Sequence, residues 1–305
     1  MLLTLLLSPL DDTRALTYNR IMNRLPIAVR VQVLSALVEG NSIRGTCRMV
    51  GVDKKTVLRL LADVGDACDV YQDDNVRGVK SARLQLDEIW SFCHAKERNL
   101  PREMRGADGV GDLWTWTALD ADSKFIVTWH LGKRLRSDAD LFIRDLAARV
   151  VSEQVQITTD GLGSYSEPIQ QWFARAGYGT EVKDYGLLDD ESPERKYSPM
   201  IVKSVIRTPV WSAPDLKHIL TAYVERQNLT MRMSMRRFTR LTNGFSKKAE
   251  NLRRSLALYF MHYNFCRKHS TIKTTPAIKA GLTNRIWAIH DLANLPDLMR
   301  GGLAA

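Results

Sequence analysis

The chain has 305 residues, of which 45% are apolar and 26% charged, so it can form one large or two modest domains with an ordinary globular core. Its net charge is +10, and the last third, from Ile201 onward, holds 18 Lys/Arg against 5 Asp/Glu. This asymmetry favours a polyanionic partner at the C-terminal end, with nucleic acid a better candidate than a membrane.

The four cysteines are scattered and form no CxxC pair, which argues against a structural zinc site and against a disulfide scaffold. A reduced cytoplasmic setting fits this usage better. The leucine-rich start Met1–Leu7 is too short to span a bilayer and lacks a basic flank. We expect residues 1–22 to be a disordered or mis-assigned extension, with Met22 as an alternative start, and we expect no membrane association.

Residues 23–66 read as a helix-turn-helix DNA-binding domain. Ser42 and Asp53 are good caps for the second and third helices, and Gly40 and Gly51 suit the turns. The expected helices are Ile27–Glu39, Ile43–Met49 and Lys54–Val64. Lys54, Lys55 and Arg59 would then face DNA from the third helix. The alternative is a small packing module whose lysines are merely solvated.

Residues 67–82 are polar and predict a linker to a catalytic core over 83–236. The core opens with a buried strand, Leu84–Phe92, in which alternation separates Gln85, Asp87 and Ile89 from Leu84, Leu86 and Glu88. Two further strands, 113–119 and 124–131, flank the tight turn 120–123 and predict a hairpin. Three consecutive antiparallel strands follow from this pattern.

A helix over 138–151, capped by Ser137, leads to the strand that ends at Asp160. Because a helical crossover allows this strand to lie parallel to the first, Asp160 should reach the same end of the sheet as Asp87. Another helix, 166–176, and a short strand near 180–183 complete a five-stranded mixed sheet flanked by helices. Residues 185–214 contain four of the ten prolines and predict an irregular insertion.

A helix from Leu216 to Met235 carries Glu225 on the same stripe as His218, Asn228, Arg232 and Arg236. A basic helical region, 237–305, follows, and Ser246 should cap its first helix. We expect DNA contacts from a set of Lys and Arg residues that spans both ends of the chain: Lys54, Lys55, Arg59, Arg232, Arg236, Arg237, Arg240, Lys247, Lys248, Arg267 and Lys268. His218, Asn228 and His269 are possible site-adjacent residues.

Asp87, Asp160 and Glu225 lie on a strand, at a strand end and on a helix, and can converge on divalent metal. Carboxylate ligands without a His/Cys cluster suit Mg²⁺, with Mn²⁺ as a substitute, in two-metal phosphoryl transfer. The remaining carboxylates of the core suit this role less well. Glu88 should point to the opposite face of its strand, the Asp residues at 120 and 122 belong to the hairpin, and those at 138 and 140 to the first turn of a helix.

Three segments, Asp87–Phe92, Thr159–Gly161 and Tyr223–Asn228, resemble the motifs of DDE transposases of the insertion sequence 1 family. The segment Tyr263–His269, followed by Thr275-Pro276-Ala277, is similar to the ends of many transposase and integrase cores. The resemblance covers about residues 81–280. It implies a ribonuclease H-like fold, Mg²⁺ dependence, and binding to the terminal inverted repeats of a mobile element.

The resemblance further implies nicking that frees a 3′-hydroxyl, followed by attack of that hydroxyl on target DNA. Asp87, Asp160 and Glu225 would be the catalytic triad, and Arg232 would match the basic residue on the Glu helix. A homo-oligomer on double-stranded DNA and a cytoplasmic, nucleoid-associated location accompany this interpretation. Two alternatives are a ribonuclease H-like nuclease without strand transfer and an inactive descendant that acts as a DNA-binding regulator.

Overall fold

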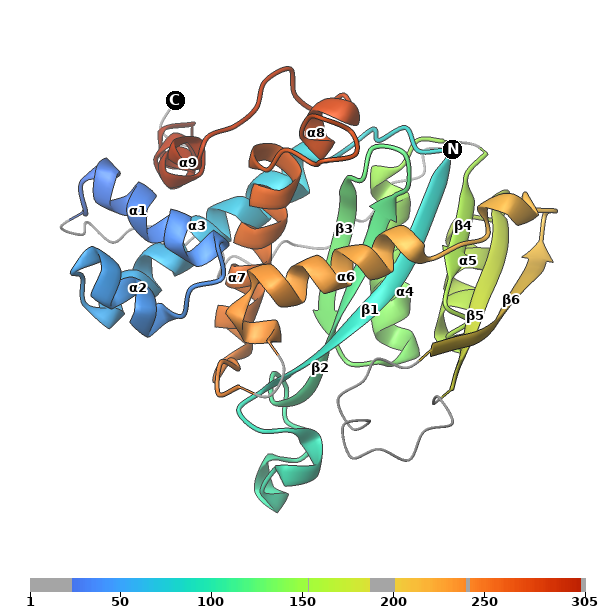
Figure 1. Cartoon of the computed structure of the whole chain (residues 1–305), viewed down its shortest axis with the longest axis horizontal. Helices are drawn as coiled ribbons and strands as arrows, with labels where there is room; N and C mark the ends of the chain where they lie inside the picture. Colours follow the sequence, from blue (N-terminus) through green and yellow to red (C-terminus); the bar gives the residue numbers. More distant parts are fainter. Residues whose placement is uncertain (1–23, 153, 187–200, 240–241, 303–305) are drawn as a thin grey trace, which may run out of the picture.

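The computed structural model describes residues 24–152, 154–186, 201–239 and 242–302. A mixed six-stranded sheet with the strand order β3-β2-β1-β4-β5-β6 organises them (Figure 1). β1 is antiparallel to β2 and parallel to β4, β5 is parallel to β4, and β6 is antiparallel to β5. The strands are β1 (Arg83–Cys93), β2 (Gly111–Asp120), β3 (Ile126–Gly132), β4 (Gln156–Thr159), β5 (Gly177–Gly186) and β6 (Ile201–Trp211).

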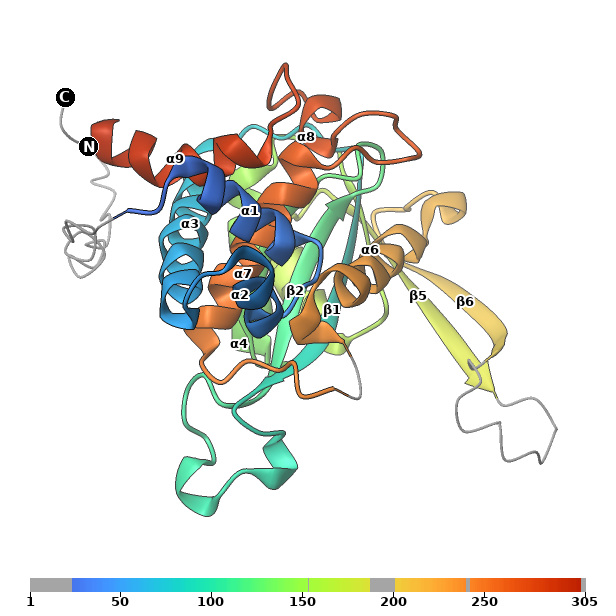
Figure 2. The ribbon, with the colours of Figure 1, turned by 60° about the vertical axis from the view of Figure 1, so that its left-hand side comes forward.

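The predicted hairpin and the predicted parallel crossover are confirmed, and the α/β architecture is consistent with a ribonuclease H-like fold. The prediction of five strands is wrong, because β6 occupies part of the predicted irregular insertion. Val202, Val205 and Ile206 favour an extended chain, and Pro209 is tolerated since β6 is an edge strand. The β5–β6 hairpin projects from the body (Figure 2). Residues 187–200 of the predicted insertion lie outside the described residues.

Helices cover both faces of the sheet, as the alternation in β1 requires. Leu84 and Leu86 pack in one hydrophobic core with Phe142 of α4, whereas Ile89 packs on the other face with Val224 of α6. Figure 1 shows α6 crossing in front of β1, with α4 and α5 behind the strands. The helices are α4 (Arg136–Arg149), α5 (Ser166–Trp172), α6 (Ala222–Ser234) and α7 (Ala249–Met261).

Several predicted helix boundaries are wrong. α4 begins at Arg136, so Ser137 lies inside its first turn and caps nothing. Asp215 accepts a hydrogen bond from the Lys217 amide and fixes a separate 3₁₀ turn, Leu216–His218, so α6 starts only at Ala222. His218 therefore does not share the face of α6 that carries Glu225.

The predicted cap of α7 is also wrong. Lys248 stands at the N-cap position without a side-chain hydrogen bond, and α7 begins at Ala249. The Ser246 hydroxyl instead accepts a hydrogen bond from Nη1 of Arg237 at 2.6 Å. The Ser246 hydroxyl therefore binds Arg237 and accepts no hydrogen bond from the first turn of α7.

Three helices precede the sheet: α1 (Ile27–Val38), α2 (Ile43–Val50) and α3 (Lys54–Asn75). The Ser42 and Asp53 caps are confirmed, since their side chains accept hydrogen bonds from the amides of Gly45 and Lys55. α3 runs to Asn75, so most of the predicted linker 67–82 is helix. The reason is a buried stripe that continues through Ala67, Cys68 and Gln72.

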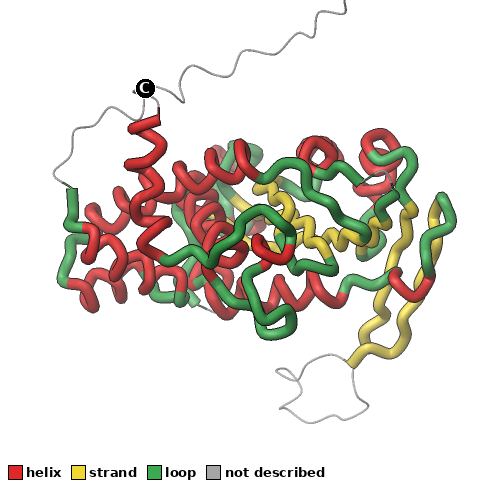
Figure 3. The backbone as a smooth tube through the Cα atoms, turned by 90° about the horizontal axis from the view of Figure 1, so that it is seen from above, coloured by secondary structure: helices red, strands yellow, loops and turns green. Residues whose placement is uncertain are grey.

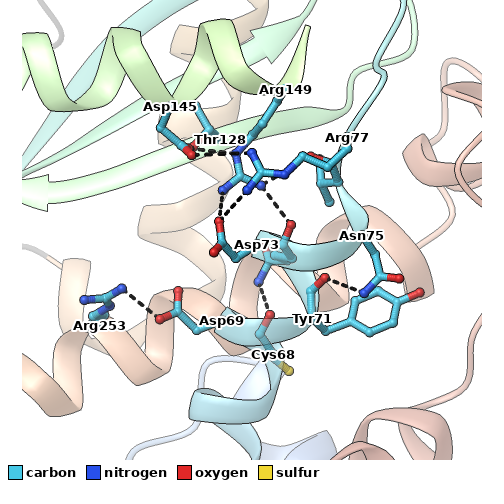
Figure 4. A network of polar contacts seen from close by, with 12 residues as sticks. Cys68, Asp69, Tyr71, Asp73, Asn75, Arg77, Thr128, Asp145, Arg149 and Arg253 are labelled. Atoms are coloured by element: carbon cyan, nitrogen blue, oxygen red, sulfur yellow. Dashed lines mark hydrogen bonds and ion pairs between the residues drawn. The ribbon is translucent and has the colours of Figure 1, made fainter. Parts of the chain in front are cut away.

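The polar side chains of this stretch are tied to the rest of the protein (Figure 4). Nη2 of Arg149 on α4 lies 2.9 Å from Oδ1 of Asp73, and its Nη1 donates to the carbonyl of Gln72 at 2.8 Å. Asp69 pairs with Arg253 of α7 at 2.8 Å. The second half of α3 thus joins the sheet and the C-terminal helices.

α3 also crosses α7 closely. A Cβ at Gly65 would lie 2.7 Å from the Arg254 carbonyl oxygen, so the crossing requires glycine. α8 (Pro276–Lys279) and α9 (Ile289–Gly302) follow, and Asp297 of α9 pairs with Arg30 of α1 at 3.1 Å. The N-terminal and C-terminal helices therefore gather beside the sheet (Figure 3). Among the described residues, no helix is long and apolar enough to span a membrane.

A carboxylate cluster beside the C-terminal end of a central strand

Asp87 lies on β1 opposite Thr117 of β2, two residues beyond the pairing of Gln85 with Thr158 of β4. β4 ends at Thr159, and Asp160 follows directly. The parallel register therefore brings both aspartates to one level of the sheet. One carboxylate oxygen each from Asp87, Asp160 and Glu88 lie within 4.8 Å of one another.

Glu88 joins this cluster although its backbone points it to the opposite face of the sheet, as predicted. Because β4 stops at Thr159, no neighbouring strand separates Glu88 from Asp160. The Glu88 carboxylate is buried, with 1% of its side chain exposed, and accepts hydrogen bonds from Tyr165 at 2.9 Å and from Nε of Arg134 at 2.7 Å. Glu88 is thus an additional acidic group at the site.

Asp87 is held from two sides. The Glu88 amide donates to its Oδ1 at 2.8 Å, and Nδ2 of Asn228 on α6 donates to its Oδ2 at 2.7 Å. The Asn228 Oδ1 is buried and has no hydrogen-bond partner among the described residues. Asn228 therefore fixes Asp87 and offers a spare oxygen beside it.

Asp160 occupies the turn after β4. The Leu162 amide donates to its Oδ1 at 3.0 Å, and Nη2 of Arg134 lies 3.7 Å from its Oδ2. The Arg134 guanidinium also stacks 4.6 Å from the ring centre of Trp114. Arg134 therefore offers positive charge to both Glu88 and Asp160.

The carboxylates repel one another. Burial, together with the charges of Glu88 and Asp160, raises the pKa of Asp87 to about 8. Burial and the charge of Asp160 likewise raise the pKa of Glu88, against the opposing effect of Arg134. Ionising all three carboxylates without a cation is therefore unfavourable, and a bound divalent ion would offset their mutual repulsion.

Glu225, in the first turn of α6, stands outside the cluster of three. Its Oε1 contacts Nζ of Lys183 on β5 and accepts a hydrogen bond from the Thr221 hydroxyl at 2.6 Å. Its charge still contributes to the raised pKa of Asp87. Glu225 lies one helical turn before Asn228, so the same face of α6 carries it toward the cluster.

The residues present fit a hard divalent cation. Asp87, Glu88 and Asp160 supply carboxylate oxygens, and Asn228 supplies an unpartnered amide oxygen beside them. Oxygen ligands of this kind suit Mg²⁺ or Mn²⁺. Asp87, Glu88 and Asp160 could hold the metal together, whereas Glu225 would first have to leave Lys183.

Most of the predicted DNA-binding residues that the structure describes are exposed. Lys54, Lys55 and Arg59 are exposed on α3, and Arg236, Lys247, Lys248 and Lys268 are exposed at or beyond the end of α6. Arg232 is half-buried, Arg237 donates to Ser246, and Nη1 of Arg267 donates to the Ser234 hydroxyl at 3.3 Å. Lys54, Arg236, Arg237 and Lys247 line one cavity. Arg240 lies outside the described residues.

The two histidines of interest stand apart from the carboxylate cluster. Nδ1 of His218 lies 2.7 Å from Nη1 of Arg83, and its Nε2 lies 3.7 Å from Asp215. His269 sits in the loop after α7, where burial and the charges of Lys124 and Arg267 lower its pKa. Neither histidine contacts Asp87 or Asp160.

Four residues at or beside the site were not predicted from the sequence as members of it: Glu88, Arg134, Tyr165 and Lys183. Arg134 lies two residues after the end of β3. Because β3 is antiparallel to β2, a basic residue near this strand end could have been predicted as a partner of the acidic residues. Lys183 lies on β5, two residues after Glu181, which Arg207 and Thr221 already bind. No local pattern distinguishes Lys183 from an ordinary strand lysine.

No family model matches the chain, and no curated protein matches it. Among solved structures, a crystal structure of a pre-cleavage Mos1 transpososome is similar over 93% of this chain and 80% of that one, at 8% identity and a TM-score of 0.29. This similarity is too low to indicate a function, which therefore depends on the chain's own residues.

Proposed function

We propose that this chain is a metal-dependent DNA strand-transfer enzyme, a DDE-type transposase of an insertion sequence. The carboxylate cluster, where β4 ends beside the middle of β1, is the observation that carries the proposal. The cluster lies just beyond the last residue of β4, near α6, which carries a third predicted ligand, Glu225. Basic side chains elsewhere on the molecule suit a polyanionic substrate.

Divalent ions, when bound, would activate the attacking oxygen and stabilise the leaving oxygen of a phosphodiester. Asp87 would serve as the shared ligand because it lies between Glu88, Asp160 and α6. Asn228 keeps the Asp87 carboxylate oriented through its amide hydrogen bond. Once bound cations neutralise Glu88 and Asp160, the Arg134 guanidinium could form an ion pair with a scissile phosphate.

Glu225 must change partner to join the site. Its charge is neutralised here by Lys183, which also lies 3.4 Å from Glu181. A rotation of the Glu225 side chain on α6 would exchange this ammonium for the metal. Glu225 and Asn228 share a helix face, so the Glu225 side chain already lies on the side of α6 that faces Asp87.

The substrate under this proposal is the terminal inverted repeat of the element, followed by a target duplex. The exposed start of α3 and the basic residues after α6 would hold the DNA, with more than one copy of the chain on the two ends. Contacts of this kind displace counterions, so binding should weaken steeply with salt.

A strand-transfer assay tests the proposal. A pre-cleaved terminal-repeat oligonucleotide, Mg²⁺ and plasmid should give joined product with the wild-type chain. Asp87→Asn should abolish joining but leave DNA binding intact, whereas Asp122→Asn, a change of equal charge in the β2–β3 turn, should preserve both. Joined product from Asp87→Asn would refute the assigned role.

A second candidate is an inactive descendant that only binds DNA. The contact between Lys183 and Glu225 favours it, because a permanent ion pair would remove one ligand from the site. DNA binding without nicking or joining would identify this regulator. Nicking without joining would instead identify a ribonuclease H-like nuclease.

A further inference from the structure

A cavity of about 670 Å³ lies among the α1–α2 turn, the start of α3, the end of α6 and α7, and no residue of the carboxylate cluster lines it. Five cations line it: Arg44, Lys54, Arg236, Arg237 and Lys247. No Asp or Glu belongs to its lining within the part of the chain that the structure describes. The cavity is therefore a concentration of positive charge without internal compensation.

Arg237 is the unusual member of this lining. Its guanidinium donates to the Ser246 hydroxyl at 2.6 Å, and no carboxylate pairs with it among the described residues. Burial lowers the pKa of Arg237 to about 10. Because a guanidinium has five N–H donors and is costly to bury without an anion, this side chain is prepared for an anionic ligand.

The remaining walls suit a ligand that is only partly charged. Leu61, Leu258 and Tyr259 form apolar surface, and Ser42 and Asn243 add neutral hydrogen-bonding groups. A phosphate attached to a sugar matches this combination better than a bare inorganic ion, which would leave the apolar wall uncovered.

We propose that this cavity binds one backbone phosphate of DNA, with the guanidinium of Arg237 as its inner ligand and Lys54 and Lys247 at its rim. The assignment rests on the proposed function for its choice of DNA as the occupant. DNA is favoured over a free nucleotide because the rim lysines continue into the exposed neighbours Lys55 and Lys248. A DNA strand bound along these lysines would pass the mouth of the cavity.

The position of the cavity gives the contact a consequence for the active site. Arg236 and Arg237 follow α6 directly, and α6 carries Glu225 and Asn228. Gly40, with a φ of +80°, allows the α1–α2 turn to approach the end of α6, since a Cβ there would lie 3.2 Å from the Ser234 carbonyl oxygen. A phosphate held here would fix the end of the Glu225 helix against the N-terminal helices.

The test compares three full-length variants: Arg237→Met, Lys247→Gln, and Arg175→Gln as a control of equal charge change on an exposed residue outside the cavity. Duplex DNA binding is measured by fluorescence anisotropy at several salt concentrations, and thermal unfolding is measured with and without inorganic phosphate. Lys247 is exposed, so its variant does not threaten the fold.

We expect Arg237→Met to weaken DNA binding about 10- to 100-fold, the usual loss for a charge-assisted hydrogen bond. The slope of log K against log salt should fall by roughly 0.9 for Arg237→Met and for Lys247→Gln, and should not change for Arg175→Gln. Inorganic phosphate should raise the unfolding temperature of the wild type and of Arg175→Gln but not of Arg237→Met. Without ligand, Arg237→Met should unfold at a higher temperature than the wild type, because a half-buried charge with no carboxylate partner among the described residues is gone.

Three results would overturn the proposal. A lower unfolding temperature for Arg237→Met without ligand would make the arginine structural. Equal phosphate stabilisation of wild type and Arg237→Met would place the anion elsewhere. Phosphate stabilisation that depends on Arg237, with DNA binding unchanged in Arg237→Met, would keep an anion site but refute DNA as its occupant. Absence of strand joining by the wild-type chain, with all the expected binding effects present, would instead count against the proposed function.

Discussion

Replacing Asp87 by asparagine should stabilise the protein in the absence of metal and at the same time abolish its stabilisation by metal. The pKa of Asp87 is raised from 3.8 to about 8 in the folded protein by burial and by the charges of Glu88 and Asp160. Between these two values the folded state binds more protons than the unfolded state, so stability falls as the pH rises. Above pH 8 the full cost of the ionised carboxylate is present.

The magnitude follows from the shift. About four pKa units at 1.36 kcal/mol each correspond to roughly 5–6 kcal/mol. Because Asp87 is half-buried and its neighbours relax when one charge is removed, we expect about 2–3 kcal/mol to be recovered by Asp87→Asn at pH 9. The substitution preserves the hydrogen bonds, since an asparagine oxygen still accepts from the Glu88 amide and Asn228 can rotate its unpartnered Oδ1 toward the new amide.

Urea unfolding followed by tryptophan fluorescence measures both effects. In EDTA, Asp87→Asn should unfold at higher urea than the wild type at pH 9, with the difference shrinking as the pH falls toward 4. With millimolar Mn²⁺ the wild type should gain stability in proportion to the logarithm of metal concentration, and the variant should not. Asp122→Asn, in the β2–β3 turn, should follow the wild type in both series.

A lower free energy of unfolding for Asp87→Asn in EDTA at pH 9 would refute this reasoning. It would mean that Asp87 is a structural hydrogen-bonding residue and not one of a set of carboxylates held together against their repulsion. An equal Mn²⁺ response in wild type and variant would refute the metal assignment separately.

Further predictions concern the residues around the site and the helix crossing. Lys183→Met should tighten Mn²⁺ binding about tenfold by calorimetry, because the ammonium no longer competes for Glu225, whereas Lys203→Met on β6 should have no effect; weaker binding in Lys183→Met would contradict the competition. Gly65→Val should lower the free energy of unfolding by about 1–3 kcal/mol, since its Cβ would collide with the backbone of Arg254, while Gly163→Ala, which has open space, should cost less than about 1 kcal/mol; equal losses would mean that α3 and α7 can separate without cost. Arg149→Met should also destabilise, by about 1–2 kcal/mol, because Asp73 and Asp145 keep only Arg77 as an arginine partner and the Gln72 carbonyl loses its donor; an unchanged urea midpoint would show that the network in Figure 4 adds nothing.

Local signals predicted the parts of the fold that depend on local chemistry. Ser42 and Asp53 cap their helices because a short side-chain oxygen before a helical run satisfies free amides wherever the helix packs. The alternation in β1 placed Gln85 and Asp87 toward α6 because a two-residue period leaves no other choice. The convergence of Asp87 and Asp160 followed from one topological rule, the parallel return of β4 through a helix.

The errors arise where tertiary contacts decide. The polar run after Gly65 reads as a linker, yet α3 continues because its buried stripe packs on the rest of the protein and Asp69 and Asp73 pair with arginines on α7 and α4. Serine is a common helix cap, but the Ser246 hydroxyl accepts its hydrogen bond from Arg237. Glu88 enters the cluster only because β4 is short, and the partner of Glu225 is a lysine from a distant strand. None of these contacts leaves a periodic signal in the sequence.

The most direct test of the central claim is a crystal structure of the protein soaked in Mn²⁺, with anomalous scattering used to locate the metal. We expect a peak within about 2.5 Å of carboxylate oxygens from both Asp87 and Asp160, with Glu225 released from Lys183. Absence of anomalous density near Asp87 and Asp160, at a Mn²⁺ concentration that saturates binding in solution, would contradict the metal assignment.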